Sequence, residues 1–137
     1  MQTFLPFPDF KECARVIDDK RLWKQILEAN QIYKIISKPN EEVTHWNLHP
    51  AVLMWKGFDL ALLEYRDVFV AEWLKRRLVE PPELEFENEC WTATKPDWLG
   101  NEKLHSSHRA ALLAKNPKHY KQFGWIEEPK IEYYWPI

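Results

Sequence analysis

The sequence predicts a mainly α-helical, compact, single-domain protein with long irregular loops and an extended C-terminal tail. Apolar residues recur at the spacing of amphipathic helices in several segments, and few segments show the period-two alternation that is typical of strands. The 137 residues fit one domain, residues 1–137, and a hydrophobic content of 45% with eight Trp is enough to fill one core.

Two helices are expected in the first 36 residues. The first follows an extended entry, takes Asp9 as its N-cap and has apolar residues at i, i+3, i+4 and i+7. These residues are Phe10, Cys13, Ala14 and Ile17. Asp18 and Asp19 are expected to cap a second helix that runs to about Ile36, where residues 37–40 predict a proline-containing loop.

The middle of the chain predicts a third helix, which starts at Pro50 and is interrupted near Gly57. A long fourth helix, capped by Asp59 and running to about Leu78, is expected to form the centre of the core. Residues 80–100 contain several prolines and a run of glutamates, which predicts an irregular loop attached to the body by tryptophan side chains. These tryptophans are Trp91 and Trp98.

The C-terminal part predicts a helix from about Glu102 to Lys115. An Asn-Pro pair and one further turn follow, and this turn is expected to end at Gly124 in the left-handed conformation. Residues 133–136 are aromatic and apolar, so we expect them to pack onto the body in an extended conformation.

Composition and charge limit the possible functions. No stretch approaches the roughly 20 consecutive apolar residues of a membrane span, and the N-terminus lacks the pattern of a signal peptide, so we expect a cytoplasmic protein. We also expect it to act as a monomer. Cys13 and Cys90 share no metal-ligand spacing and predict buried, reduced thiols. The net charge of −2 is untypical of an indiscriminate nucleic-acid binder.

Charge is distributed unevenly along the chain. Residues 103–125 contain five Lys or Arg and three His but no Asp or Glu, whereas glutamates concentrate between residues 80 and 89 and near the C-terminus. Such segregation allows a protein to present a basic face to phosphates while it remains acidic overall.

The second predicted helix carries a polar stripe beside its apolar face. The stripe consists of Arg21, Lys24, Gln25 and Glu28. One carboxylate among cations suits an acid or base that acts on an anionic substrate. It also suits a solvated helix face in which Lys24 and Glu28 form a surface ion pair worth roughly 0.3 kcal/mol.

Two groups in the basic segment are candidate phosphate contacts. His105, His108 and Arg109 offer ring and guanidinium donors that suit a backbone oxyanion. With His45 or His49 the two histidines allow a metal site, but no carboxylate lies at matched spacing and basic neighbours repel a dication, so no metal is expected. In the second group, cations alternate with rings that suit either stacking on bases or a hydrophobic core. This group comprises Lys118, His119, Tyr120, Lys121 and Phe123.

Several motifs follow one another in a specific order. Residues 19–28 read Asp-Lys-Arg-Leu-Trp-Lys-Gln-Ile-Leu-Glu. Further motifs are the turn at 48–51, the segment 55–76, and residues 104–109, 116–117 and 120–124. In this order the motifs resemble the pyrimidine-dimer DNA glycosylase family of phage and bacterial repair enzymes, over most of the chain. Glu28 falls where the family has its catalytic glutamate.

The resemblance implies a DNA repair N-glycosylase with AP-lyase activity that acts on double-stranded damaged DNA without a metal or cofactor. In the family, the N-terminal α-amine attacks C1′ of the damaged nucleotide to form a Schiff base, which gives Met1 this role here. Glu28 stabilises the cationic transition state and moves protons. An α-amine is about 3.5 kcal/mol easier to deprotonate at neutral pH than a lysine. The implied DNA contacts are Arg21, Lys24, Gln25, His105, His108, Arg109, Lys118, Tyr120 and Lys121.

Three positions depart from the phage pattern. Gln2 is a bulky second residue that ordinarily blocks methionine removal, so Met1 is expected to keep the amine. Leu27 replaces an arginine and His119 a tryptophan, which leaves open a damaged or modified base other than a pyrimidine dimer. A noncatalytic helical nucleic-acid-binding module, indicated by the basic segment, is the main alternative. A metal hydrolase is a further alternative, built on His49, His105 and His108.

Overall fold

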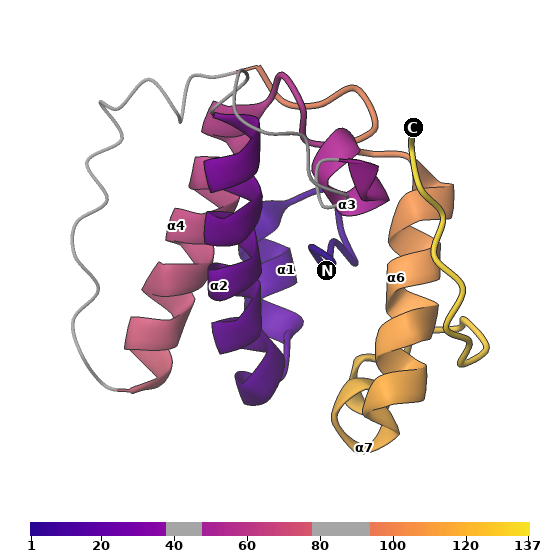
Figure 1. Ribbon diagram of the computed structural model, residues 1–137. Helices are drawn as coiled ribbons and strands as arrows, with labels where there is room; N and C mark the ends of the chain where they lie inside the picture. Colours follow the sequence, from indigo (N-terminus) through magenta and orange to yellow (C-terminus); the bar gives the residue numbers. More distant parts are fainter. Residues whose placement is uncertain (38–47, 78–93) are drawn as a thin grey trace.

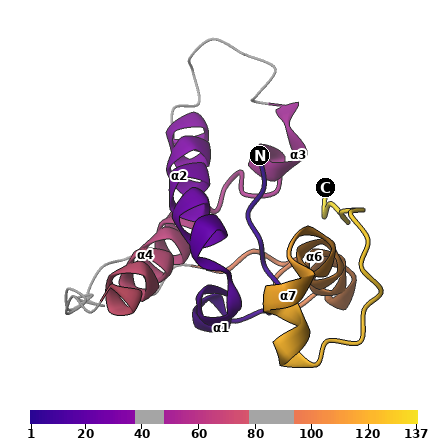
Figure 2. The same cartoon turned by 90° about the horizontal axis from the view of Figure 1, so that it is seen from below.

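The computed structural model describes residues 1–37, 48–77 and 94–137, and the described residues form helices and no strand. Two groups of helices face each other across the extended N-terminal segment, residues 1–9 (Figure 1). One group contains α1 (Phe10–Val16), α2 (Asp19–Ile36) and α4 (Asp59–Arg76), and the other contains α6 (Glu102–Lys115), α7 (Pro117–Tyr120) and the 3-10 helix η2 (Lys121–Phe123). The short α3 (Pro50–Leu53) lies beside the N-terminus in both views (Figure 2). The predicted mainly α-helical class is confirmed.

The starts of the first two helices differ in how they are capped. The Asp9 carboxylate accepts hydrogen bonds from the backbone amides of Lys11 and Glu12, as predicted for the N-cap of α1. Asp18 occupies the N-cap position of α2 but makes no capping bond. Its carboxylate instead accepts from the hydroxyl of Tyr120 and from the guanidinium of Arg21 at 3.2 Å. This buried use of the side chain ties α2 to α7.

α2 and α4 pack against each other and carry much of the core. Gly57, with φ 86°, makes the predicted interruption between α3 and α4. Asp59 is the first residue of α4 rather than its cap, since Phe58 takes the N-cap position without a side-chain bond. The inward face of α4 buries Leu62, Tyr65 and Phe69 completely.

The C-terminal part follows its predicted course. Gly124 has φ 68°, the left-handed conformation expected after the last turn. Trp98 donates a 2.8 Å hydrogen bond to the carbonyl of Met54 and lies edge-on to Trp55 at 5.0 Å, which attaches its segment to the body. The tail after Gly124 is irregular and runs along α6 (Figure 1), where the amide of Tyr134 donates to the hydroxyl of Ser107 at 3.1 Å.

Some predictions lie outside the described residues. These are the loop after residue 37, the acidic run at 80–89, and the environments of His45, Cys90 and Trp91. Cys13 is a free, buried cysteine, as predicted, and burial raises the pKa of its thiol. None of the described helices is long and apolar enough to cross a membrane.

Candidate active site

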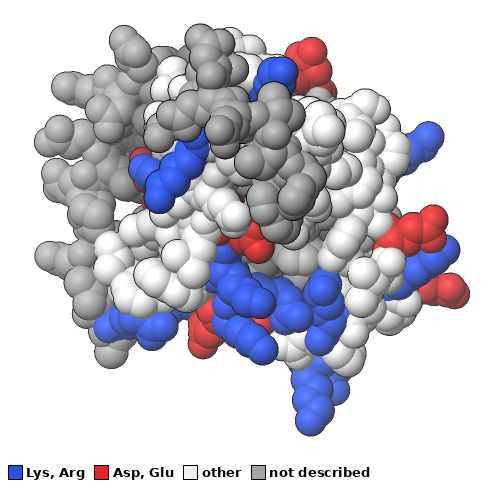
Figure 3. All heavy atoms as spheres, in the orientation of Figure 1, with Lys and Arg blue, Asp and Glu red and all other residues white. Residues whose placement is uncertain are grey.

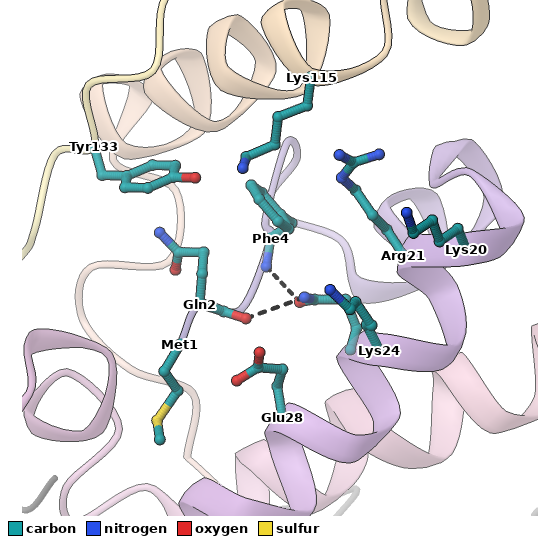
Figure 4. A pocket seen from close by; sticks show the side chains of 10 residues that line it. Met1, Gln2, Phe4, Lys20, Arg21, Lys24, Glu28, Lys115 and Tyr133 are labelled. Carbon is teal, nitrogen blue, oxygen red and sulfur yellow. Dashed lines mark hydrogen bonds between the residues drawn. The ribbon is translucent and has the colours of Figure 1, made fainter.

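The N-terminal segment is held by buried polar side chains from α2 and α4. The Gln25 Oε1 accepts from the backbone amide of Phe4 at 2.7 Å and from the hydroxyl of Tyr65 at 2.8 Å. The Gln25 Nε2 donates to the carbonyl of Gln2 at 3.1 Å (Figure 4). The Tyr65 hydroxyl also lies 2.9 Å from the carbonyl of Phe4. The amide of Gln25 therefore bonds the main chain on both sides of Thr3.

α6 holds the same segment from the opposite side. The backbone amide of Leu5 donates to Nδ1 of His108 at 2.9 Å, and the carbonyl of Leu5 lies 2.7 Å from Nδ1 of His105. Nε2 of His105 accepts from the amide of Gly100 at 2.9 Å, which leaves its Nδ1 as the donor to Leu5. Burial lowers the pKa of both rings, that of His108 to about 3, so both are neutral at pH 7.

These bonds satisfy a backbone that belongs to neither a helix nor a sheet. An extended buried segment exposes peptide groups that require partners, and here side chains supply them. Trp55 adds another bond by donating its Nε1 to the Thr3 hydroxyl at 2.9 Å. The segment is consequently fixed from residue 2 to residue 5, and this fixes the position of Met1.

Met1 lies at a pocket of about 260 Å³ between α2 and α6. The pocket is lined by Met1, Gln2, Phe4, Lys20, Arg21, Lys24, Gln25, Glu28, Lys115 and Tyr133. Figure 4 shows the half-buried Glu28 carboxylate directed toward the N-terminal segment, next to Met1. The single acid of the lining and the first residue of the chain therefore share one cavity.

The pocket is strongly basic on the side formed by α2 and the end of α6. Lys20, Lys24 and Lys115 are exposed, and in the described part of the chain no carboxylate forms an ion pair with them. Arg21 pairs with Asp18 at 3.2 Å. Lys and Arg side chains gather on the face seen in Figure 3, around the hollow between the lower ends of α2 and α6. This arrangement suits a phosphate-bearing ligand.

The N-terminal amine and Glu28 both interact electrostatically with the ring of His49, at the start of α3. Burial lowers the pKa of His49, the N-terminal amine lowers it further and Glu28 raises it. Nδ1 of His49 accepts from the amide of Ala51 at 3.0 Å, which fixes the ring as the cap of α3. The three groups thus lie within electrostatic range of one another.

All four residues of the predicted polar stripe line the pocket, but one of them has a different role from the other three. Arg21, Lys24 and Glu28 face the pocket, and Lys24 and Glu28 form no ion pair with each other within the described residues. Gln25 was predicted to contact DNA, yet only 3% of it is exposed, because its amide is occupied by the N-terminal segment. The structure places it as a support of the segment.

Most of the candidate residues from the basic segment also lie elsewhere than predicted. His105, His108 and Tyr120 have no exposed surface, because the histidines hold Leu5 and the tyrosine holds Asp18. The guanidinium of Arg109 donates to Glu127 at 2.6 Å, to the carbonyl of Pro6 at 2.7 Å and to Glu102. These four side chains are turned inward and are not available to a phosphate in this conformation.

The two remaining candidates, Lys118 and Lys121, are exposed on α7 and η2 but do not line the pocket. The rings of their group pack among themselves. Tyr120 and Phe123 both stack on Trp125 at 5.5 Å, and Nε2 of His119 lies 2.8 Å from the carbonyl of Val16. The hydrophobic-core interpretation of these aromatics therefore fits the structure better than base stacking.

Sequence reasoning missed several residues of the lining. Lys20 extends the stripe by one turn, since it precedes Lys24 and Glu28 at intervals of four, and this signal was present in the sequence. Lys115 and Tyr133 come from distant segments, and only the packing of the tail and of α6 brings them to the pocket. Among the described residues, no group of three or more His, Cys, Asp or Glu could hold a metal ion.

The model of the pyrimidine dimer DNA glycosylase family matches residues 1–85, more than half of the chain. The chain belongs to this family. The match includes the N-terminal segment and all of α2, and so both Met1 and Glu28. Comparison with curated proteins and with solved structures gave no match.

Membership of the pyrimidine dimer DNA glycosylase family confirms the predicted family and makes the chain a DNA repair glycosylase that acts on damaged DNA. The matched region supplies most of the lining, whereas Lys115 and Tyr133 lie outside it.

Proposed function

We propose that the protein excises damaged bases from double-stranded DNA and then cuts the strand as an AP lyase, with the α-amine of Met1 as nucleophile. Pyrimidine dimers are the first candidate lesion, and another damaged or modified base remains an alternative substrate. The proposal is supported by one observation above others: Met1 and Glu28 line a single pocket whose rim is basic. We further propose a cytoplasmic monomer that needs no metal or cofactor.

In the proposed reaction the neutral amine attacks C1′ of the damaged nucleotide. The bond from C1′ to the base breaks, its electron pair leaves with the base, and the base is protonated. The C1′–O4′ bond then breaks, O4′ takes up a proton that the nitrogen loses, and a Schiff base forms between Met1 and C1′. An α-amine suits this step because it holds a far larger neutral fraction at pH 7 than a lysine does.

Glu28 has two parts in this proposal. Its carboxylate stabilises the positive charge that develops on the sugar, and it then accepts the proton from C2′. Loss of that proton breaks the C3′–O bond by β-elimination, so the strand is cut on the 3′ side and the phosphate leaves. Water finally hydrolyses the Schiff base and releases the amine.

The basic rim holds the DNA in this proposal. Three exposed lysines lie beside the pocket, Lys20 and Lys24 on α2 and Lys115 on α6, and Arg21 lines it as well while it pairs with Asp18. A phosphodiester on either side of the lesion would therefore meet cations from two helices. The duplex must be bent, or a nucleotide extruded, for C1′ to reach Met1.

Borohydride trapping tests the proposal. The protein is incubated with a duplex that carries an abasic site or a pyrimidine dimer, the Schiff base is reduced, and the covalent adduct is measured on a denaturing gel. We expect an adduct with the unmodified protein, about a 100-fold lower rate with Glu28→Gln, and no adduct when the terminus is acetylated.

Glu12→Gln is a matched control, because Glu12 is exposed on α1, lies outside the pocket and forms an ion pair with Arg15. It should form adduct at the unmodified rate. Salt-sensitive DNA binding without any adduct, unchanged in Glu28→Gln, would instead establish the noncatalytic binding module.

A further inference from the structure

Gln2 and Tyr133 form the wall of the pocket across from the cations of α2, and Phe4 lies between the two sides (Figure 4). The amine of Lys115 comes down from α6 next to the Tyr133 hydroxyl. Tyr133 is half-buried, and its ring lies edge-on to Phe4 at 6.1 Å and to His108 at 6.0 Å. Trp135 contacts it from the tail at 5.7 Å. Neighbours on three sides therefore fix the orientation of this ring, and Figure 4 shows its hydroxyl directed into the pocket.

The side chain of Gln2 has an unused hydrogen-bond donor on the same wall. Its Oε1 accepts from the amide of Thr3 at 2.9 Å, which identifies the other atom as the NH₂ group. Gln2 is 7% exposed, and within the described residues its Nε2 has no hydrogen-bond acceptor. Figure 4 shows this amide pointing toward Tyr133. A buried donor without a partner is costly and calls for an explanation.

We propose that Gln2 and Tyr133 are specificity-determining residues that recognise the base to be removed, on the wall across from the cations that α2 offers to its phosphates. The ring of Tyr133 contacts the face or edge of the base, and the Gln2 Nε2 donates to the carbonyl oxygen beside the glycosidic nitrogen. This inference rests on the proposed function and assigns the base to a defined part of the pocket.

The chemistry of a pyrimidine suits this arrangement. Its C2 carbonyl is bonded to N1, the nitrogen that leaves C1′, and a cross-linked or saturated pyrimidine keeps that carbonyl. When the C1′–N1 bond breaks, the electron pair spreads onto this oxygen, so an N–H donor there stabilises the departing base until water protonates it. A purine has no carbonyl next to its glycosidic nitrogen, so the Gln2 donor would remain without a partner.

A comparison of two DNA substrates distinguishes a role in base recognition from a general disruption of the active site. A dimer-containing duplex requires removal of the base, whereas the same duplex with an abasic site has no base to recognise. For Gln2→Met and Tyr133→Leu we expect the ratio of base-excision rate to abasic-site trapping rate to fall at least tenfold from the unmodified value. Gln2→Met keeps a bulky second residue, and mass spectrometry checks that Met1 is retained.

Tyr134→Leu is the matched control, because Tyr134 is the adjacent aromatic residue of the tail and does not line this pocket. Its ratio should equal that of the unmodified protein. Tyr133→Phe keeps the ring and should lie closer to the unmodified protein than Tyr133→Leu.

The outcomes are distinct. A proportional loss of both rates in Gln2→Met and Tyr133→Leu, or no change in either, overturns the assignment of the base to this wall but leaves the proposed function standing. If the unmodified protein forms no adduct on either substrate, the proposed function and the wall assignment fall together.

Discussion

α2 and α6 lie on opposite sides of the N-terminal segment and use similar polar side chains in different ways. α2 presents Lys20, Lys24 and Glu28 to the pocket and keeps only Gln25 for the segment. α6 does the reverse, because its histidines are buried against Leu5 and only Lys115, its last residue, reaches the pocket. In the proposed reaction one helix supplies the catalytic carboxylate, and the other supplies the support that places the first residue.

The type of a polar residue therefore does not by itself reveal its role. The buried peptide groups of residues 2–5 need partners, and both helices turn amide or imidazole groups inward to provide them. Substitutions on the inward side should therefore lower stability first, and substitutions on the pocket side should change DNA chemistry or binding first.

Arg109→Ala should give the largest loss of stability on the α6 side. Arg109 and Glu127 are 12% and 10% exposed, and removal of the cation leaves the carboxylate nearly buried and unpaired. We expect the free energy of unfolding to fall by about 3 kcal/mol. Urea unfolding measures this, with Arg15→Ala as the control, since that variant breaks a well-exposed pair and should change stability little. Equal effects of the two variants would contradict the inward role.

Gln25→Ala tests the inward residue of α2. It leaves the amide of Phe4 and the carbonyl of Gln2 without partners, so we expect a loss of about 2 kcal/mol in unfolding free energy. Displacement of Met1 should also lower borohydride trapping about 100-fold. Gln31→Ala, on the exposed side of the same helix, is the control and should leave both measurements unchanged. If Gln25→Ala lowers the stability but its folded fraction is trapped at the unmodified rate, the Gln25 amide does not position Met1.

Acid should destabilise the α6 side through His108. The pKa of this ring is about 3 in the folded protein and about 6.5 in an unfolded chain, so between these values the unfolded chain binds a proton that the folded one does not. Stability is therefore complete above pH 6.5 and falls as the pH drops toward 3, by at most about 1.4 kcal/mol per pH unit. The neighbouring His105, whose pKa is also lowered, adds to the same trend.

Thermal melting from pH 7.5 to 4 measures this effect. His108→Gln keeps an acceptor for the Leu5 amide but cannot titrate, so its melting temperature should depend less steeply on pH. Identical slopes in the two proteins would show that the acid sensitivity arises elsewhere.

Lys24→Ala should have the smallest effect, and only on DNA binding. Loss of one phosphate contact lowers affinity uniformly across sequences and reduces the slope of log K against log salt by about 1. Lys75→Ala, an exposed lysine near the end of α4 and outside the pocket, should keep the full slope. A slope that is unchanged in Lys24→Ala would place the DNA away from this rim.

The sequence predicted the helices well where local signals were strong. The Asp9 cap, the end of α2 near Ile36 and the left-handed Gly124 all follow from short-range chemistry. The burial of Gln25 was also within reach, because it lies three residues after Leu22 and four before Ala29 on the apolar face.

The burial of the α6 histidines could not be predicted from local sequence signals. Whether His105 and His108 face solvent or core depends on the path of residues 2–5, about 100 positions away in the chain. The same limit applies to Tyr133, which reaches the pocket only because the tail packs back along α6.

The hydrogen bonds to residues 2–5 also restrict the length of the N-terminal segment. Each of residues 2–5 makes a hydrogen bond to a side chain of the body, and Gln25 serves both Gln2 and Phe4. An inserted residue between Met1 and Phe4 would therefore either carry the first nitrogen about 3.3 Å further out or force these bonds out of register. A change in the length of this segment is therefore expected to move the amine relative to the pocket that Met1 and Glu28 line. Fusion partners and purification tags therefore belong anywhere but in front of the first methionine.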